Sequence, residues 1–127
     1  MTRAEFVQRL ILNSMSDDFE NVDQVILRDV AAVAAKCGLT ITRPEVVENL
    51  RTLVQAGLAK AYDLSAATGD PFSAELDSIP PLDAPEENFR TYFYPTPKGI
   101  EFHKSDGTWW PLDDNDLLRS DWEPPRS

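Results

Sequence analysis

Few side chains in this sequence have the types and spacing that chemistry requires. It contains a single histidine, His103, and a single cysteine, Cys37, which lie far apart along the chain, so no cluster has the spacing of zinc ligands. Asp113, Asp114 and Asp116 resemble half of a calcium-binding loop, but the glycine and the closing glutamate of such a loop are missing. The glycines are isolated and form no phosphate-binding loop. We therefore predict that the protein is not an enzyme, with no catalytic residue, no cofactor and no metal site.

Net charge is the strongest global feature of the chain. The 127 residues carry a formal net charge of −10, and the charge is uneven: residues 1–64 hold nine acidic and seven basic side chains, whereas residues 65–127 hold thirteen and five. An acidic protein is repelled by nucleic acid and by anionic membranes. The sequence shows no apolar leader and no long apolar run, and one cysteine predicts no internal disulfide. We therefore expect a cytoplasmic protein with no membrane contact.

The best-defined local signal runs from residue 42 to residue 64. Thr42 and Glu45 have the spacing of a capping box, and Pro44 falls in the first turn, where its missing N–H does no harm. An apolar stripe at helical spacing follows, made of Val46, Val47, Leu50, Leu53 and Val54. Gly57 can take the left-handed conformation that ends a helix, and residues 58–64 alternate as a strand does. This pattern predicts a helix, a glycine stop and a strand.

Similar signals predict the other elements. Thr2 and Glu5 make a second capping box, which predicts a helix over residues 3–14, and a further helix is expected over residues 24–37. Residues 65–90 hold several prolines and six acidic side chains, which predicts a long acidic loop, partly ordered at best. Aromatic and β-branched residues over 88–94 indicate a strand that pairs antiparallel with 58–64. Thr96 and Pro97 then predict the start of a short helix.

This order of elements resembles winged helix-turn-helix transcriptional regulators of the bacterial multiple-antibiotic-resistance and phenolic-acid-repressor type. Two stretches carry the resemblance: GLTITRPEVVENLRTLVQAGLAKAY, with a turn, a recognition helix, an AGL stop and the first wing strand, and TYFYPTPKGIEF, with the second wing strand and a TPKG helix start. The resemblance implies an α+β, mainly α fold, with a three-helix core, a two-stranded wing, a long acidic wing loop and a short C-terminal helix. We assign residues 1–104 to a winged-helix domain and residues 105–127 to an acidic, tryptophan-containing tail packed on it.

In regulators of this type the third helix enters the major groove and the wing touches the DNA backbone. Carried onto this sequence, the resemblance implies candidate DNA contacts in the third helix and beside the wing, namely Arg43, Asn49, Arg51, Thr52, Lys60 and Arg90. At about 100° per residue, the face opposite the apolar stripe centres between Glu48 and Thr52, with Glu45 beside them. These two carboxylates and the net charge disfavour contact with phosphates.

Three tryptophans, Trp109, Trp110 and Trp122, lie in the polar tail. Because an indole ring is costly to leave in water, one interpretation is that the tail folds back over the helical core. The alternative is that the three rings are interaction anchors for a partner or for a second copy of the chain. The sequence leaves open whether the tail packs in cis or in trans.

Two functional hypotheses follow. The first is a regulatory protein–protein interaction module whose acidic wing binds a protein partner, basic in charge, or a second copy of the chain in a homodimer. The alternative is a DNA-binding transcriptional regulator that uses the third helix as a dimer. The distribution of charge favours the first hypothesis.

Overall fold

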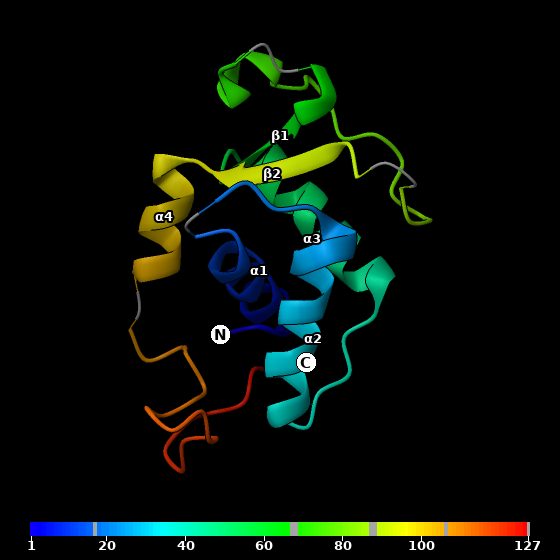
Figure 1. The fold of residues 1–127 in the computed structure, drawn as a ribbon. Helices are drawn as coiled ribbons and strands as arrows, with labels where there is room; N and C mark the ends of the chain where they lie inside the picture. The colour runs from blue at the N-terminus through cyan, green and yellow to red at the C-terminus, as the bar shows by residue number, and fades with distance from the viewer. Residues whose placement is uncertain (17, 67–68, 87–88, 106, 127) are drawn as a thin grey trace.

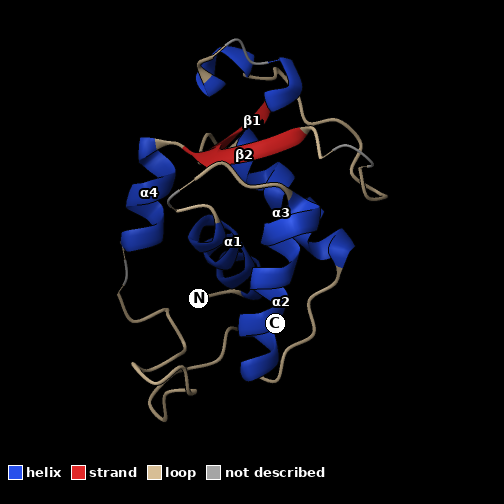
Figure 2. Cartoon of the chain, viewed as in Figure 1, coloured by secondary structure: helices blue, strands red, loops and turns tan. Residues whose placement is uncertain are grey.

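A computed structural model describes residues 1–16, 18–66, 69–86, 89–105 and 107–126. Its described part has four α-helices and a two-stranded antiparallel sheet (Figures 1 and 2), which confirms the prediction of an α+β, mainly helical protein. The helices are α1 (Arg3–Ser14), α2 (Leu27–Lys36), α3 (Arg43–Gln55) and α4 (Pro97–Lys104), and the strands are β1 (Ala59–Asp63) and β2 (Thr91–Pro95). None of the described helices combines the length and the apolar character needed to cross a bilayer.

Helix α1 forms the centre of the core. In Figure 1 it lies between α4 on one side and α2 and α3 on the other, and the sheet lies across one end of the helices. Apolar side chains at helical spacing on α1 are buried, namely Phe6, Val7, Leu10 and Ile11, and Met15 just after the helix is buried with them. Leu50 of α3 and Phe93 of β2 are buried in the same cluster. Burial of this stripe is the main reason that the helices assemble around α1.

The first turns of the helices are capped differently from one another. The hydroxyl of Thr2 accepts the backbone N–H of Glu5, as the capping box predicts. Thr42 is the N-cap residue of α3, but its side chain makes no capping hydrogen bond, so the capping box predicted for Thr42 and Glu45 is wrong. The carboxylate of Glu45 instead accepts two hydrogen bonds from Arg3, at 2.7 and 3.0 Å. This charge-assisted pair with α1 ties the two helices together.

The segment predicted as one helix over residues 24–37 contains two helical elements. A π-helical turn over Val22–Ile26 precedes α2, which begins at Leu27, and the Asn21 side chain caps the turn by accepting the backbone N–H of Gln24. The side chain of an asparagine is well suited to this position because its oxygen can satisfy a free donor at the helix start.

Strands β1 and β2 pair antiparallel, as predicted, with Ala59 opposite Pro95 and Tyr62 opposite Tyr92. The loop between them was expected to be partly ordered at best, and residues 67–68 and 87–88 of it lie outside the described residues. Its described parts contain 3-10 turns over Leu64–Ala66 and Pro71–Ala74. Leu82 is only 1 % exposed and belongs to the core cluster, so this part of the loop packs on the helices instead of extending from them.

The AGL stop and the TPKG helix start contact each other directly. Gly57 has a φ of +75° and ends α3. The hydroxyl of Thr96 donates to the Gly57 carbonyl at 2.7 Å and accepts the backbone N–H of Gly99, while the Thr96 N–H donates to the Leu58 carbonyl at 3.1 Å. One threonine therefore caps α4 and docks it on the turn between α3 and β1.

The segment after α4 folds back onto α1. In Figure 1 it passes along the end of the helices that lies away from the sheet. The indole rings of Trp109 and Trp122 are 6 % and 9 % exposed, and their centroids lie 6.3 and 5.4 Å from that of Phe6. Backbone bonds from Arg3 to the Arg126 carbonyl and from Arg126 to the Met1 carbonyl bring the two ends of the described chain together.

Candidate functional site

The outer flank of α3 is the surface on which DNA contacts were predicted. Arg43 lies at its first turn, where the guanidinium forms an ion pair with Asp23 and donates to the carbonyls of Leu82 and Ala84, both at 3.1 Å. The Arg43 side chain is therefore surrounded by groups from two other segments of the chain, and it fastens the long loop to α3. These contacts explain the position of Arg43 without a ligand, because they hold the long loop and Asp23 against α3.

Replacing Arg43 by methionine is expected to lower the free energy of unfolding by about 2 kcal/mol, because the Asp23 carboxylate would be left half-buried without its partner. The matched control is Arg28→Met. Arg28 pairs with Asp29 at the surface, where the side chains are 72 % and 45 % exposed, compared with 16 % and 12 % for the Arg43 pair. Exposed pairs contribute about 0–1 kcal/mol. Urea unfolding of the two variants checks the difference, and equal losses would contradict a structural role for Arg43.

The other three candidates on α3 also bond within the chain. Asn49 is buried, accepts the side-chain amide of Gln8 at 3.1 Å and donates to the Glu45 carbonyl at 2.9 Å. Arg51 donates to the Pro80 carbonyl at 3.3 Å, so the loop covers this flank of α3 from its first turn to its third. The hydroxyl of Thr52 donates to the carbonyl of Glu48 in the preceding turn. Thr52 and Glu48 are exposed side by side.

Both cations beside the sheet are neutralised by neighbouring carboxylates. Lys60 forms an ion pair with Glu75 at 2.7 Å, and Arg90 forms one with Asp63 at 2.9 Å. Each pair connects a residue of β1 to the long loop, Lys60 to Glu75 within the loop and Asp63 to Arg90 at its end. The positive charge that the resemblance assigned to the wing is thus largely compensated.

The Asp63 pair gives a prediction about pH. Hydrogen bonding from the Ser65 hydroxyl, and then from Arg90, lowers the pKa of Asp63 below the ordinary value. Because the folded-state pKa is depressed, this group stabilises the fold above its unfolded pKa of about 3.9, and the contribution is lost as the pH falls through the folded-state pKa. When the pH is lowered from about 6 to about 3, we expect the free energy of unfolding to fall less for the Asp63→Asn variant than for the parent chain. Urea titrations at both values test this, and equal losses would refute it.

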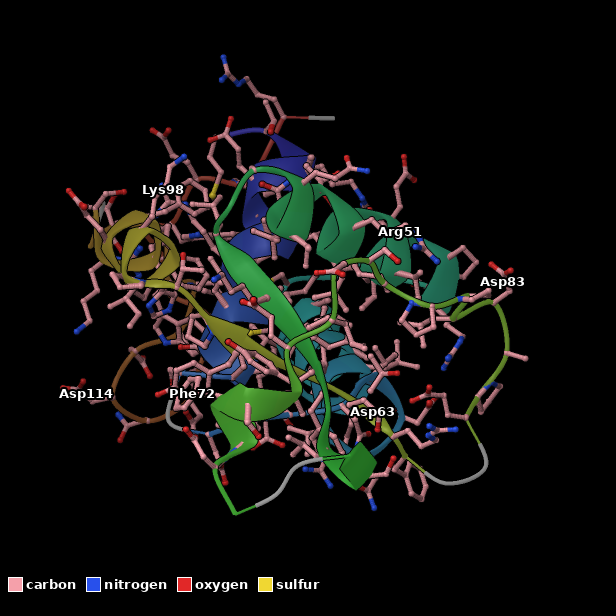
Figure 3. All side chains as sticks on the ribbon, turned by 90° about the horizontal axis from the view of Figure 1, so that it is seen from above. Arg51, Asp63, Phe72, Asp83, Lys98 and Asp114 are labelled. Carbon is pink, nitrogen blue, oxygen red and sulfur yellow. The ribbon has the colours of Figure 1, made fainter. Side chains whose placement is uncertain are left out.

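Two groups of exposed acidic side chains that form no ion pair in the described part of the chain lie on separate parts of the surface. Asp70, Asp77 and Asp83 are exposed along the long loop, and Asp114 and Asp116 are exposed in the tail. Figure 3 shows Asp83 at the same side of the molecule as Arg51, and Asp114 at the opposite side. Among the described residues no group of histidine, cysteine, aspartate or glutamate side chains is arranged to hold a metal ion.

The lone histidine and cysteine make structural contacts. His103 Nε2 lies 3.2 Å from the side-chain oxygen of Asn13, and burial, with the nearby charge of Arg9, lowers the pKa of its imidazole. Burial raises the pKa of the Cys37 thiol, which reduces its thiolate fraction at neutral pH.

The tail tryptophans, predicted either to fold back or to serve as anchors, do not behave alike. The Trp122 indole N–H donates to the Trp109 carbonyl at 2.9 Å, and the Trp109 indole N–H donates to the His103 carbonyl at 3.1 Å. Trp110 is partly buried, with its ring 5.3 Å from that of Trp109 in an edge-on arrangement. Trp109 and Trp122 are therefore core residues of their own chain.

A hollow of about 610 Å³ lies beside these two tryptophans. Its lining includes Arg119 and Arg126 but also Asp121 and Glu123. Because charges of both signs face it in equal number, this hollow favours neither an anion nor a cation.

A cluster of aromatic side chains on the sheet was not predicted from the sequence. Phe19, Tyr62, Phe72 and Tyr94 pack with ring centroids 4.6–5.8 Å apart. Phe72 belongs to the 3-10 turn over Pro71–Ala74, yet it is 52 % exposed. The only available signal was a phenylalanine between prolines and acids in a loop, which does not by itself indicate packing on a sheet.

Comparisons of the chain with protein-family models, with curated proteins and with solved structures found no match.

Proposed function

We propose that this chain is a non-catalytic winged-helix module that binds a basic protein partner through the acidic surface of its wing loop. One observation carries the proposal. Each of the six side chains that the resemblance assigned to DNA is held by a hydrogen bond or an ion pair within the chain, while acidic side chains of the loop remain exposed. A surface of this kind attracts cations and repels phosphates.

The winged-helix assignment is supported by the order and pairing of the elements. Three helices are followed by an antiparallel strand pair and then by a fourth helix, and a long loop joins the strands. In this interpretation β1 and β2 are the wing strands, and residues 64–90 are the wing loop. Arg43 and Arg51 of α3 donate hydrogen bonds to carbonyls of this loop, those of Pro80, Leu82 and Ala84. In this interpretation the wing loop therefore covers the face of α3 that a recognition helix would turn toward DNA.

Binding of DNA by α3 would require these contacts to break. Releasing Arg43 leaves Asp23 unpaired, and the exposed Glu48 would then face phosphates. Both changes are unfavourable, because a half-buried carboxylate loses its partner and like charges approach each other. A basic protein partner needs no such rearrangement.

The proposal is tested with two fluorescent probes titrated with the full chain at about 50 and about 200 mM salt. One probe is a random DNA duplex, and the other is an eight-residue peptide of alternating arginine and serine. We expect saturable binding of the peptide and none of the duplex. Saturable duplex binding that weakens steeply with salt would overturn the proposal in favour of DNA recognition.

A matched pair of variants separates a specific acidic surface from net charge alone. The wing-loop variant Asp77→Asn/Asp83→Asn and the tail variant Asp114→Asn/Asp116→Asn remove the same charge from exposed positions. Asparagine suits position 116, where φ is +60°. We expect the wing-loop variant to raise the Kd for the peptide by about threefold to tenfold and the tail variant to change it little. Equal effects of the two variants would show non-specific attraction and would count against the acidic wing.

A further inference from the structure

The aromatic cluster on the sheet forms a partly exposed shelf. We use the name aromatic shelf for Phe19, Tyr62, Phe72 and Tyr94, whose rings contact one another mostly edge to face. Tyr62 is buried beneath the others, whereas Phe72 has 52 % of its surface in water. Phe72 thus carries a large apolar area at a position that the fold leaves open.

A hollow of about 320 Å³ continues from the shelf to the start of α4. Its lining combines three shelf residues with apolar side chains from the end of β2 and the start of α4, namely Tyr62, Phe72, Tyr94, Pro95, Pro97 and Ile100, and it also includes the polar Lys60 and Thr96. Ile100 is 37 % exposed at its edge. An exposed aromatic and an exposed aliphatic side chain on two sides of an apolar hollow form the kind of surface that anchors a side chain of another protein.

The charges around the shelf are mostly negative. Asp70 caps the 3-10 turn by accepting the backbone N–H of Phe72 at 3.0 Å, and its carboxylate is exposed. Glu75 lies at the other end of the same turn and neutralises Lys60, the cation that lines the hollow. Asp70 therefore leaves a surplus negative charge beside an apolar hollow. This combination is complementary to a segment that is both basic and apolar.

We propose that the aromatic shelf and its hollow bind an extended basic segment of the partner protein. Apolar side chains of the segment enter the hollow between Phe72 and Ile100. Its arginine or lysine side chains lie across the Phe72 ring, where a cation is attracted to the π face, and reach the carboxylate of Asp70. This inference rests on the proposed function, because it places the basic partner on one part of the wing.

The experiment compares two labelled peptides of equal charge, one of alternating arginine and leucine and one of alternating arginine and serine. Anisotropy titrations use the full chain and two pairs of variants. Phe72→Ala removes the shelf ring, and Leu117→Ala removes another exposed apolar side chain, 63 % exposed in the tail. Asp70→Asn removes the charge but keeps an oxygen that can cap the turn, and Asp114→Asn removes a charge from the tail. Circular dichroism confirms that each variant is folded.

We expect the leucine peptide to bind more tightly than the serine peptide. Phe72→Ala and Asp70→Asn should each raise its Kd by about threefold to tenfold, while the two tail variants leave it unchanged. If the parent chain binds neither peptide, the proposed function fails together with this inference. If it binds both equally, and Phe72→Ala and Asp70→Asn behave as the tail variants do, only this inference is overturned. Light scattering that shows a dimer broken by Phe72→Ala would also overturn it, in favour of a second copy of the chain as the occupant.

Discussion

Replacing Gly99 with alanine is expected to destabilise the protein by at least about 3 kcal/mol. A Cβ atom at this position would lie 1.8 Å from the Leu58 carbonyl oxygen and 2.9 Å from its carbon. These are backbone atoms of the turn that ends α3, so relief requires α4 to move as a whole. Alanine favours the helical conformation by about 1 kcal/mol over glycine, which is too little to offset such a clash.

The control is Gly107→Ala, where a Cβ atom would have nothing within 4 Å. That substitution should be neutral or raise stability by less than about 1 kcal/mol, because alanine restricts the unfolded chain. Chemical denaturation of both variants gives the comparison. A Gly99→Ala variant as stable as Gly107→Ala would show that α4 does not dock closely on the AGL turn.

Replacing Trp122 with alanine is expected to lower the free energy of unfolding by about 3–5 kcal/mol. The indole is 9 % exposed, its ring contacts Phe6 at 5.4 Å, and its N–H donates to the Trp109 carbonyl. The variant therefore opens a cavity beside α1 and leaves the Trp109 carbonyl without its donor. The change is a large fraction of the total stability of an ordinary domain.

Trp110→Ala removes the same side chain from a partly buried position and serves as the control. Its ring contact with Trp109 accounts for about 1 kcal/mol. Guanidinium unfolding followed by circular dichroism avoids any dependence on tryptophan fluorescence, which both variants alter. A Trp122→Ala variant no less stable than Trp110→Ala would mean that the tail does not complete the core in solution.

The helices were predictable because their signals are local. Thr2 and Thr96 cap helices whose first turns lie within four residues of them, and Gly57 ends α3 through its own backbone conformation. The apolar stripe of α1 repeats at a helical period, so the buried face follows from spacing alone. Each of these features depends on a few neighbouring residues, and no distant partner competes with them.

The packing of the wing loop and the hydrogen-bond partners of Glu45 and Arg43 could not be predicted, because they depend on residues far apart in the sequence. Leu82 is buried among helices far from it in sequence, and it is surrounded by prolines and acids that carry no periodic signal. Glu45 had two potential partners, and the Arg3 guanidinium of α1 binds it in place of Thr42. Arg43 was assigned to DNA through a resemblance, whereas its contacts with Asp23 and the loop depend on tertiary structure.

The proposed site likewise has one part that local sequence predicts and one part that only the fold creates. The acidic character of the loop is evident from composition, and the exposure of Asp77 and Asp83 agrees with it. The aromatic shelf required Phe19, Tyr62, Phe72 and Tyr94 to meet from four separate segments. Only the fold brings such residues together, because none of them is spaced to face another along one element.

The packing of Phe6 against Trp109 and Trp122 has a consequence for synthesis on the ribosome. Helix α1 is made first, but the two rings that cover Phe6 are made near the end of the described chain. At about 5–20 residues per second, Phe6 is synthesised on the order of ten seconds before the two rings that cover it. Completion of the core is thus a late event in the life of each new molecule, and it depends on contacts with large separation along the chain.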